Sequence, residues 1–217
     1  MITAIINQKG GVGKSSTAVH LAYWLKQQGK SVVLIDSDTQ ASSSMWIKSL
    51  DIPALVQSDP NELAENIPEI VKGYDHAVID GAGGLSEATR VILYYANIAI
   101  IPCQPTALDL VSSGSVVKLV KQAQRFRPDL IGATFINRAI KGTNLVRETQ
   151  DALGNIEGII HLETIIYQRQ CIADAFGQEQ TVFDMGINGE KSAQEYQNLF
   201  TEVMGLWIKL ESRWTRL

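Results

Sequence analysis

A glycine-rich loop near the N-terminus constrains the fold of this chain more than any other feature of the sequence. Residues 9–16 read Lys-Gly-Gly-Val-Gly-Lys-Ser-Ser and directly follow the apolar run at residues 2–6. A strand that leads into such a loop, followed by a helical pattern, is typical of a phosphate-binding loop. Glycines let successive backbone N–H groups turn toward phosphate oxygens, and the N-terminus of the following helix favours an anion.

The polar residues of this loop have separate chemical tasks. Lys14 supplies a point charge at the β- and γ-phosphates of a nucleotide, and Ser15 offers its hydroxyl to Mg²⁺. The usual pattern begins with a glycine where this chain has Gln8, and a second lysine, Lys9, stands directly after it. A second lysine adds little to the binding of one nucleotide, so we expect Lys9 to have a task of its own. The expected nucleotide contacts are Lys9, Gly10, Gly11, Val12, Gly13, Lys14, Ser15 and Ser16.

The arrangement resembles the deviant Walker A motif, KGGxGK[ST], of the ParA/MinD family of P-loop ATPases. The resemblance implies an ATPase that uses ATP and Mg²⁺ and forms a sandwich homodimer, in which two subunits stack nucleotide to nucleotide. It also implies that Lys9 reaches across the dimer to the phosphates bound by the other subunit and acts in hydrolysis together with Lys14. The alternative is that Lys9 is an exposed loop lysine of an ordinary P-loop protein.

Two further strand-like runs end in aspartates. Asp36 and Asp38 follow the apolar run at residues 31–35, and Asp80 follows the run at residues 75–79. Carboxylates that leave strand ends beside a phosphate-binding loop can order a Mg²⁺-bound water or an attacking water. We therefore expect these three side chains to lie near the loop.

The family resemblance assigns a role to each of these aspartates. The first pair lies in an Asp-Ser-Asp-Thr-Gln segment, which matches the family's DxDPQ segment with threonine in place of proline. By this match Asp36 supports the metal shell through water, and Asp38 positions the nucleophilic water. Asp80 corresponds to the Walker B aspartate, which contacts Mg²⁺ through water, whereas Ser15 binds the metal directly. Residues 81–84, Gly-Ala-Gly-Gly, stand where relatives carry prolines.

The second half of the chain offers candidates for contacts to the base and to DNA. The run at residues 131–136 leads into Asn137, and in the family an asparagine at this place hydrogen-bonds the adenine. The resemblance assigns that contact to Asn137. Residues 168–177 resemble the short segment that closes over the base. Basic residues at places like Arg169 and Lys191 bind DNA in ParA relatives, and we expect the same of these two.

Short apolar runs alternate with helical patterns along the chain. The expected strands lie at residues 2–6, 31–35, 75–79, 98–101, 131–136 and 158–166, and the expected helices at 16–28, 61–71, 86–96, 108–126 and 144–153. Most runs are nearly continuous in Val, Ile and Ala, as is typical of strands covered on both faces. We therefore predict an α/β fold in one domain, residues 1–217: a mainly parallel, twisted sheet with helices on both faces, as in P-loop NTPases of the deviant Walker A type.

The last expected element is one long helix at about residues 193–216. Apolar side chains gather on one side of it: Leu199, Val203, Leu206, Trp207, Leu210, Trp214 and Leu217. Charged side chains are expected on the other side: Glu195, Glu202, Lys209, Arg213 and Arg216. Such a stripe indicates packing on the domain, whereas tryptophans beside Lys and Arg are also typical of a membrane-surface helix.

Composition narrows the class of protein. The chain has 45 % hydrophobic and 19 % charged residues, which are globular values, and no run approaches the roughly 18 apolar residues of a membrane span. We recognise no signal peptide and expect a cytoplasmic protein, with Cys103 and Cys171 as reduced thiols. The net charge of −4 does not indicate a nucleic-acid binder, but residues 118–147 carry seven basic residues against one acid. Local charge, rather than the total, decides how a surface meets phosphate backbones.

These features favour a ParA-like ATPase, similar to the small plasmid-type members. Its ATP-bound dimer would bind nonspecific DNA on the nucleoid and position or partition cargo such as a plasmid, a chromosome or an organelle. A ParB-like or other adaptor protein would stimulate hydrolysis and release the dimer. The alternative is a MinD-like membrane-cycling ATPase that uses the C-terminal helix. A metabolic P-loop enzyme would need acid–base or thiol constellations that the sequence does not show.

Overall fold

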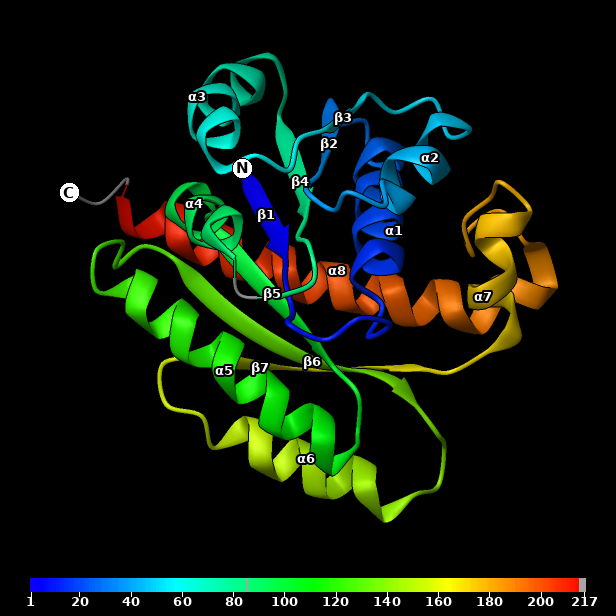
Figure 1. Cartoon of the computed structure of the whole chain (residues 1–217). Coiled ribbons are helices and arrows are strands. Elements are labelled where there is room, and N and C mark those ends of the chain that lie inside the picture. The colour runs from blue at the N-terminus through cyan, green and yellow to red at the C-terminus, as the bar shows by residue number, and fades with distance from the viewer. Residues whose placement is uncertain (85, 215–217) are drawn as a thin grey trace.

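The computed structural model describes residues 1–84 and 86–214, with the backbone alone at 211, 213 and 214 (Figure 1). Within these residues the centre is a seven-stranded sheet in the order β3-β2-β4-β1-β5-β6-β7, and every neighbouring pair is parallel. The strands are β1 (Ile2–Ile5), β2 (Val32–Asp36), β3 (Ala54–Val56), β4 (His76–Asp80), β5 (Ile98–Cys103), β6 (Ile131–Ala139) and β7 (Ile160–Tyr167). The helices are α1 (Lys14–Gln27), α2 (Ser42–Lys48), α3 (Pro60–Ile70), α4 (Glu87–Tyr95), α5 (Ala107–Gln124), α6 (Asn144–Gly154), α7 (Gln170–Gly177) and α8 (Gly186–Trp214), with a 3₁₀ turn at Val71–Gly73.

Helices cover both faces of the sheet, as the continuous apolar strands require. On one face α1, α2 and α8 pack on a buried cluster that includes Leu21, Phe135 and Leu199. On the other face α3, α4, α5 and α6 pack on a second cluster, which includes Ile79 and Val120 (Figure 1). The predicted parallel sheet with two helical layers is confirmed.

The parallel register brings the carboxyl ends of β1, β2 and β4 to one edge of the sheet. Asp80 at the end of β4 pairs with Ile5 of β1 on one side and with Asp36 of β2 on the other. After β4 the chain crosses to β5 on the far side of β1, so β1 lies where the strand order reverses. Ligands of open α/β sheets bind at this switch point. The glycine-rich loop begins there.

Three elements were not expected from the sequence: β3, α2 and α7. The β3 strand has only three residues and lies at the sheet edge, so it is too short to show a pattern. Helix α2 begins in a run of three serines. Its start is fixed by a carboxylate from the end of β2, because the Ser44 N–H donates to Asp36 Oδ2 at 2.9 Å. Local propensity carries no sign of such a contact.

The final helix begins at Gly186, seven residues before the predicted start at 193. Gly186 and Gly189 argued against helix, because glycine lowers helix propensity by about 1 kcal/mol. Tertiary packing explains Gly189: a Cβ there would lie 2.1 Å from the Val182 carbonyl oxygen. The predicted end, at about 216, falls outside the described residues.

Helix α8 packs on the sheet through the predicted apolar stripe. Leu199 and Val203 are fully buried, and Leu206 and Trp207 lie against the same core cluster. The side chain of Trp214 and all of Leu217 lie outside the described part of the chain. None of the helices within the described residues combines the length and apolarity that crossing a bilayer requires.

Two of the glutamates predicted on the charged side of α8 contact the backbone of β7. Glu202 accepts hydrogen bonds from the backbone N–H groups of Glu163 and Thr164, and Glu195 accepts one from Tyr167 N. All three donors belong to β7, which is the edge strand of the sheet. An edge strand leaves a row of N–H groups without strand partners, and these carboxylates satisfy part of that row.

Candidate nucleotide-binding site

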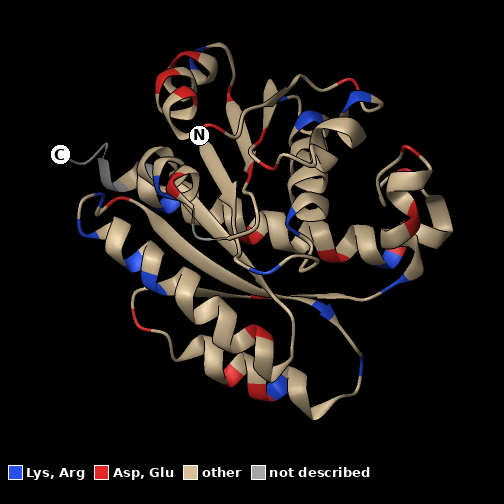
Figure 2. Cartoon of the chain, in the orientation of Figure 1, with Lys and Arg blue, Asp and Glu red and all other residues tan. Residues whose placement is uncertain are grey.

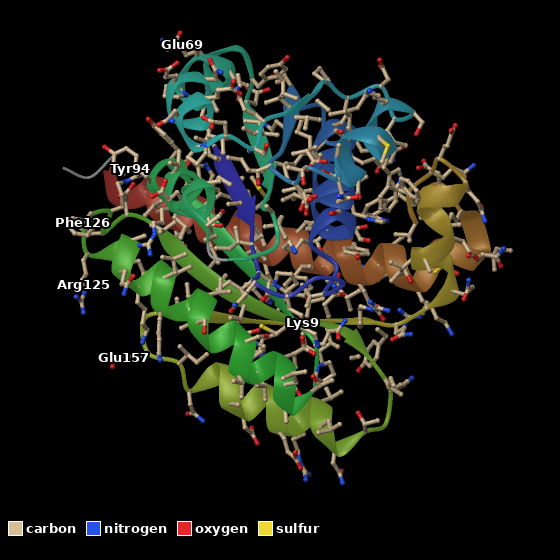
Figure 3. The ribbon with its side chains drawn as sticks, viewed as in Figure 1. Lys9, Glu69, Tyr94, Arg125, Phe126 and Glu157 are labelled. Atoms are coloured by element: carbon tan, nitrogen blue, oxygen red, sulfur yellow. The ribbon has the colours of Figure 1, made fainter. Side chains whose placement is uncertain are left out.

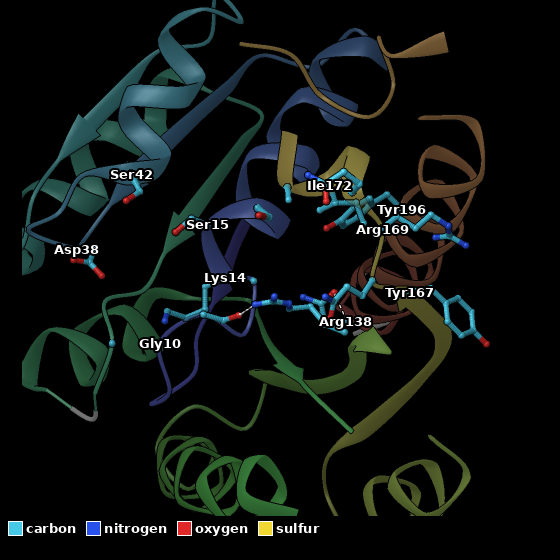
Figure 4. A pocket seen from close by; sticks show the side chains of 18 of the residues that line it. Gly10, Lys14, Ser15, Asp38, Ser42, Arg138, Tyr167, Arg169, Ile172 and Tyr196 are labelled. Carbon is cyan, nitrogen blue, oxygen red and sulfur yellow. Dashed lines mark hydrogen bonds between the residues drawn. The ribbon is translucent and has the colours of Figure 1, made fainter. Parts of the chain in front are cut away.

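A cavity of about 650 Å³ opens beside the glycine-rich loop. Its lining includes Gly10, Lys14 and Asp38 on one side and Arg169 and Tyr196 on the other (Figure 4). The cavity therefore joins the carboxyl edge of the sheet to α7 and α8, segments that lie more than 100 residues apart in sequence. All loop residues predicted to contact a nucleotide line it, with the exceptions of Lys9 and Val12.

The loop owes its shape to two glycines and to the start of α1. Gly11 and Gly13 have φ values of 75° and 93°, which side-chain-bearing residues rarely adopt. Helix α1 begins at Lys14, so its free N–H groups lie at the cavity. Burial lowers the pKa of Lys14, and the negative charges of Asp80 and Asp38 oppose that shift. The Lys14 ammonium donates a hydrogen bond to the Lys9 carbonyl oxygen at 3.3 Å.

Residues at the end of β6 hold two carbonyl groups of this loop. Asn137 Nδ2 donates to the Val12 oxygen at 2.7 Å, and Arg138 Nη1 donates to the Gly11 oxygen at 2.6 Å. Because the peptide unit is planar and trans, fixing a carbonyl also fixes the N–H of the next residue in the opposite direction. The contacts therefore turn two loop N–H groups away from β6. A Cβ at position 13 would lie 2.2 Å from Asn137 Nδ2, so this approach requires glycine.

The predicted adenine contact of Asn137 is not tested by this geometry. Its side chain lines the cavity and is 2 % exposed. Both ends of the amide are already bound: Nδ2 donates to Val12, and Oδ1 accepts from the Arg138 N–H at 3.0 Å. An adenine contact would use a remaining lone pair or hydrogen of the same amide. No pattern around Arg138 predicts its contact with the loop.

The three predicted aspartates lie at the ends of β2 and β4. Asp36 is fully buried, and its oxygens accept from the backbone N–H groups of Asp38 at 3.0 Å and Ser44 at 2.9 Å. It thus shapes the loop that carries Asp38. Asp38 lines the cavity, and its Oδ1 accepts from Gln40 N at 3.0 Å.

Asp80 is a buried carboxylate with the hydroxyls of Ser15 and Ser43 nearby. It is 1 % exposed, and neither oxygen has a hydrogen-bond partner among the described residues. Burial raises its pKa to about 6, whereas the hydroxyls of Ser15 and Ser43 and the charge of Lys14 act in the opposite direction. An ionised carboxylate in this position needs a cation or bound water.

These residues fit a Mg²⁺ ion that is held mainly by phosphate and water. No group of three or more His, Cys, Asp or Glu side chains within the described residues could by itself hold a metal. Mg²⁺ usually keeps several waters and takes one or two protein ligands beside substrate phosphates. The unsatisfied oxygens of Asp80 next to the Ser15 hydroxyl meet that need.

Lys9 differs from Lys14 although both lie in the same loop. Its ammonium forms an ion pair of 2.9 Å with Asp109 Oδ2 in the first turn of α5. Lys9 therefore points away from the cavity of its own subunit. Asp109 lies 100 residues further along the chain and was not singled out from the sequence.

The two predicted DNA contacts lie in different environments. The Arg169 guanidinium makes two hydrogen bonds to Glu195, of 2.5 and 2.6 Å, and lies over the Tyr167 ring at the rim of the cavity. Lys191 is exposed on α8, and the ion pairs found among the described residues do not include it. Lys191 is thus available to a ligand outside the protein, whereas Arg169 is neutralised within it.

Comparison with known proteins decides which family this site belongs to. The sequence profile of the CobQ/CobB/MinD/ParA nucleotide binding domain matches residues 3–182, which include the whole loop and all of the seven strands except Ile2 at the start of β1. The chain belongs to this family. It is therefore a nucleotide-binding protein with the ATPase fold of the ParA/MinD group.

Alignments with two relatives cover this chain to different extents. Maintenance of carboxysome distribution protein A of Halothiobacillus neapolitanus is 27 % identical over 208 residues, which are 93 % of this chain and 95 % of that protein. Chromosome-partitioning ATPase Soj of Thermus thermophilus is 31 % identical over 133 residues, or 46 % of this chain and 53 % of that protein. In the second case the match extends over about half of the relative.

Solved structures share the fold at lower identity. The septum site-determining protein MinD of Pyrococcus horikoshii, complexed with Mg-ADP, has a TM-score of 0.74 at 21 % identity, over 93 % of this chain and 95 % of that one. A complex of Cyanothece McdA with ATP has a TM-score of 0.73 at 14 % identity, over 94 % and 96 %. The ATP and Mg²⁺ expected from the sequence agree with the ligands of these neighbours.

Proposed function

We propose that this protein is a Mg²⁺-dependent ATPase whose ATP-bound homodimer binds nonspecific DNA and positions a cargo in the cell. The observation that carries the proposal is the split between the two loop lysines. Lys14 lies at the cavity, whereas Lys9 points out of it, toward α5. A cation that cannot serve the nucleotide of its own subunit is available for that of a second subunit.

The residues of the cavity have defined tasks in this proposal. Lys14, the helix N-terminus and the loop N–H groups bind the β- and γ-phosphates, and Asn137 contacts the adenine. Ser15 would bind the metal, with Asp36 and Asp80 supporting it through water, and the ion would supply positive charge to neutralise the phosphates. Asp38 positions the attacking water. Lys9 of the other subunit stabilises the charge that develops on the transferred phosphoryl group, as arginine fingers do in other NTPases.

DNA binding follows from dimerisation, which doubles each basic surface. Helix α5 and the turn after it carry Lys118, Lys121 and Arg125, and Figure 2 shows basic residues along this helix. Lys191 adds further positive charge on α8, and Arg169 is the second proposed DNA contact, whose charge is balanced by Glu195 in the free subunit. Affinity rises steeply with the number of phosphate contacts, so a dimer of an acidic chain can bind DNA that the monomer releases. The protein would then be cytoplasmic and nucleoid-associated, and a ParB-like or other adaptor would stimulate hydrolysis.

Two names among the relatives support a positioning role. One relative is a carboxysome distribution protein and another a chromosome-partitioning ATPase, and the first matches over nearly its whole length. The MinD-like alternative requires an apolar helix face that is free to enter a membrane. In α8 the corresponding stripe is packed on the core from Tyr196 to Trp207. The positioning ATPase is therefore the proposal we retain.

Lys9→Ala tests the shared site. This variant should bind ATP with nearly unchanged affinity, fail to dimerise, and lose hydrolysis by about 10³-fold or more, as when a finger residue is removed. Turnover measured by phosphate release, together with light scattering in ATP, gives both values. Lys141→Ala, which removes an exposed lysine from the β6–α6 loop, is the matched control. An unimpaired ATPase in Lys9→Ala would contradict the shared site.

The ligand of the ATP state is tested separately with Asp38→Ala. This variant should retain ATP and the dimer while hydrolysing at least about 10²-fold more slowly, because its water is not positioned. Binding to nonspecific duplex DNA and to anionic liposomes is then measured with ATP and with ADP. DNA binding that requires ATP and weakens with salt supports the proposal. Liposome binding without DNA binding would transfer the function to the membrane.

A further inference from the structure

The ion pair between Lys9 and Asp109 has unequal partners. The Lys9 side chain is 35 % exposed, whereas the Asp109 side chain is fully buried at the start of α5. Lys9 lies in the loop between β1 and α1, on the side that faces α5 (Figure 3). The pair therefore consists of a partly exposed cation and a fully buried carboxylate.

Asp109 has few other partners. Its Oδ2 also accepts a hydrogen bond of 2.5 Å from the Thr106 hydroxyl, which in turn accepts from the Asp109 N–H at 3.1 Å. Its Oδ1 has no hydrogen-bond partner among the described residues. Lys9 is thus the one cation paired with this carboxylate in the described structure.

The backbone of Lys9 is anchored, so its side chain is the part that can change partner. The Lys9 N–H donates to Asn7 Oδ1 at 3.2 Å, and its carbonyl accepts from Lys14. Asn7 is held in turn by the Pro102 carbonyl at 2.7 Å. Four methylenes connect this fixed backbone to the ammonium, which can leave Asp109 by rotation alone.

Departure of Lys9 has an energetic consequence at α5. Removing one partner from a buried ion pair leaves an uncompensated charge in the interior, which is strongly unfavourable. One ammonium cannot satisfy Asp109 and the phosphates of a second subunit at the same time. The two acceptors therefore compete for it.

We propose that Asp109 is a latch that holds Lys9 in the free subunit and so raises the threshold for dimerisation. This inference rests on the proposed function, because it takes the dimer to need Lys9. The latch makes dimerisation depend on two bound nucleotides, because their phosphates outcompete the Asp109 carboxylate for the Lys9 ammonium. Subunits without nucleotide therefore do not associate. Asp109 contacts neither nucleotide nor water in this role; it positions Lys9.

Asp109→Asn tests the latch, because the carboxamide keeps the shape and the Thr106 hydrogen bond but loses the charge. With a nonhydrolysable ATP analogue, half-dimerisation should require about tenfold less protein than in the wild type, as expected for loss of a charged hydrogen bond. Sedimentation velocity gives the midpoint. Asp151→Asn is the matched control, because it removes an equal charge from an exposed site on α6. It should dimerise as the wild type does.

The direction of the change separates a latch from a structural role. A damaged α5 would weaken dimerisation, whereas an opened latch strengthens it. Wild-type or weaker dimerisation of folded Asp109→Asn overturns the latch. If Asp109→Asn does not fold, Asp109→Ser, whose hydroxyl can bond the helix N-terminus, replaces it with the same expectation.

Lys9→Ala distinguishes failure of the latch from failure of the proposed function. If Lys9→Ala does not dimerise while Asp109→Asn behaves as the wild type, the shared site stands and the latch is wrong. If Lys9→Ala dimerises normally, the shared site fails, and the latch fails with it. The double variant should match Lys9→Ala, because a latch has no effect without the lysine it holds.

Discussion

The nucleotide cavity has two walls that are built in different ways. The phosphate-loop wall comprises residues 10–16 with Asp36, Asp38 and Asp80, which lie at or after the ends of β1, β2 and β4. Of these residues, Val12, Asp36 and Asp80 are buried behind the cavity surface and do not line it themselves. The β6–α8 wall comprises Asn137, Arg138, Arg169 and Tyr196, which come from three separate segments. Figure 4 shows the two walls facing each other.

The difference lies in what holds each wall. The phosphate-loop wall depends on backbone geometry, through positive φ angles and a helix N-terminus. The β6–α8 wall depends on long-range side-chain contacts. Tyr196 stacks on His20 of α1, with ring centroids 4.4 Å apart, and burial lowers the pKa of that histidine to about 4, so it packs as a neutral ring. Substitutions in the phosphate-loop wall should therefore affect ATP binding and hydrolysis. Substitutions in the β6–α8 wall should also lower the free energy of unfolding.

Gly13→Ala should have the largest effect, because Gly13 lies where the phosphate loop packs against Asn137 of the β6–α8 wall. The new methyl would require a strained φ and would lie 2.2 Å from Asn137. We expect loss of about 2–4 kcal/mol in the free energy of unfolding and at least about 100-fold weaker ATP binding. Chemical denaturation and calorimetry measure both. Gly10→Ala is the control for stability, since a Cβ there meets nothing within 4 Å; an equal loss of stability in the two variants would contradict the close approach.

Asp80→Asn, in the phosphate-loop wall, should raise the stability of the nucleotide-free protein while it weakens Mg²⁺ binding. Burial raises the pKa of Asp80 from 3.8 to about 6, so the folded chain binds more protons than the unfolded chain between these values. Stability of the nucleotide-free protein therefore falls as the pH rises through this window and stays lower above it. Without this charge the variant should be more stable at pH 8, by roughly 2–3 kcal/mol, with a smaller difference at pH 5.

The same variant should lose the dependence of ATP binding on Mg²⁺, because the metal shell loses its buried carboxylate. Urea unfolding at the two pH values and ATP titrations with and without Mg²⁺ provide the measurements. A nucleotide-free Asp80→Asn protein that is less stable than the wild type at pH 8 would show that the carboxylate has partners within the protein.

The smallest effects are expected at the two predicted DNA contacts, Arg169 and Lys191. Arg169→Ala frees Glu195 and should lower the free energy of unfolding by about 1–2 kcal/mol. Lys191→Ala should leave stability within about 0.5 kcal/mol and weaken DNA binding severalfold. Thermal unfolding and DNA titration at two salt concentrations distinguish them. A Lys191→Ala protein with unchanged DNA affinity would remove this residue from the interface.

Much of the fold could be predicted because the strands are short, buried and separated by regular helical patterns. The five helices expected before residue 160 are all present, with ends that differ by at most two residues. The elements that escaped prediction, β3, α2 and α7, have no apolar pattern of sufficient length. The early start of α8 at Gly186 escaped for another reason, since the glycine in its first turn, Gly189, is required by close packing against Val182 that the local sequence does not show.

The phosphate-loop wall follows from local patterns of residues. Its loop glycines, Lys14 and the aspartates at the ends of β2 and β4 can be recognised in the sequence, and parallel strands bring their carboxyl ends together. The partners of these groups depend on how the chain packs: Asn137 and Arg138 bind the loop carbonyls, Arg169 pairs with Glu195, and Lys9 pairs with Asp109. Each of these contacts joins residues that are 26 to 127 positions apart, and no local pattern specifies which distant side chain a packed core will bring within hydrogen-bonding distance.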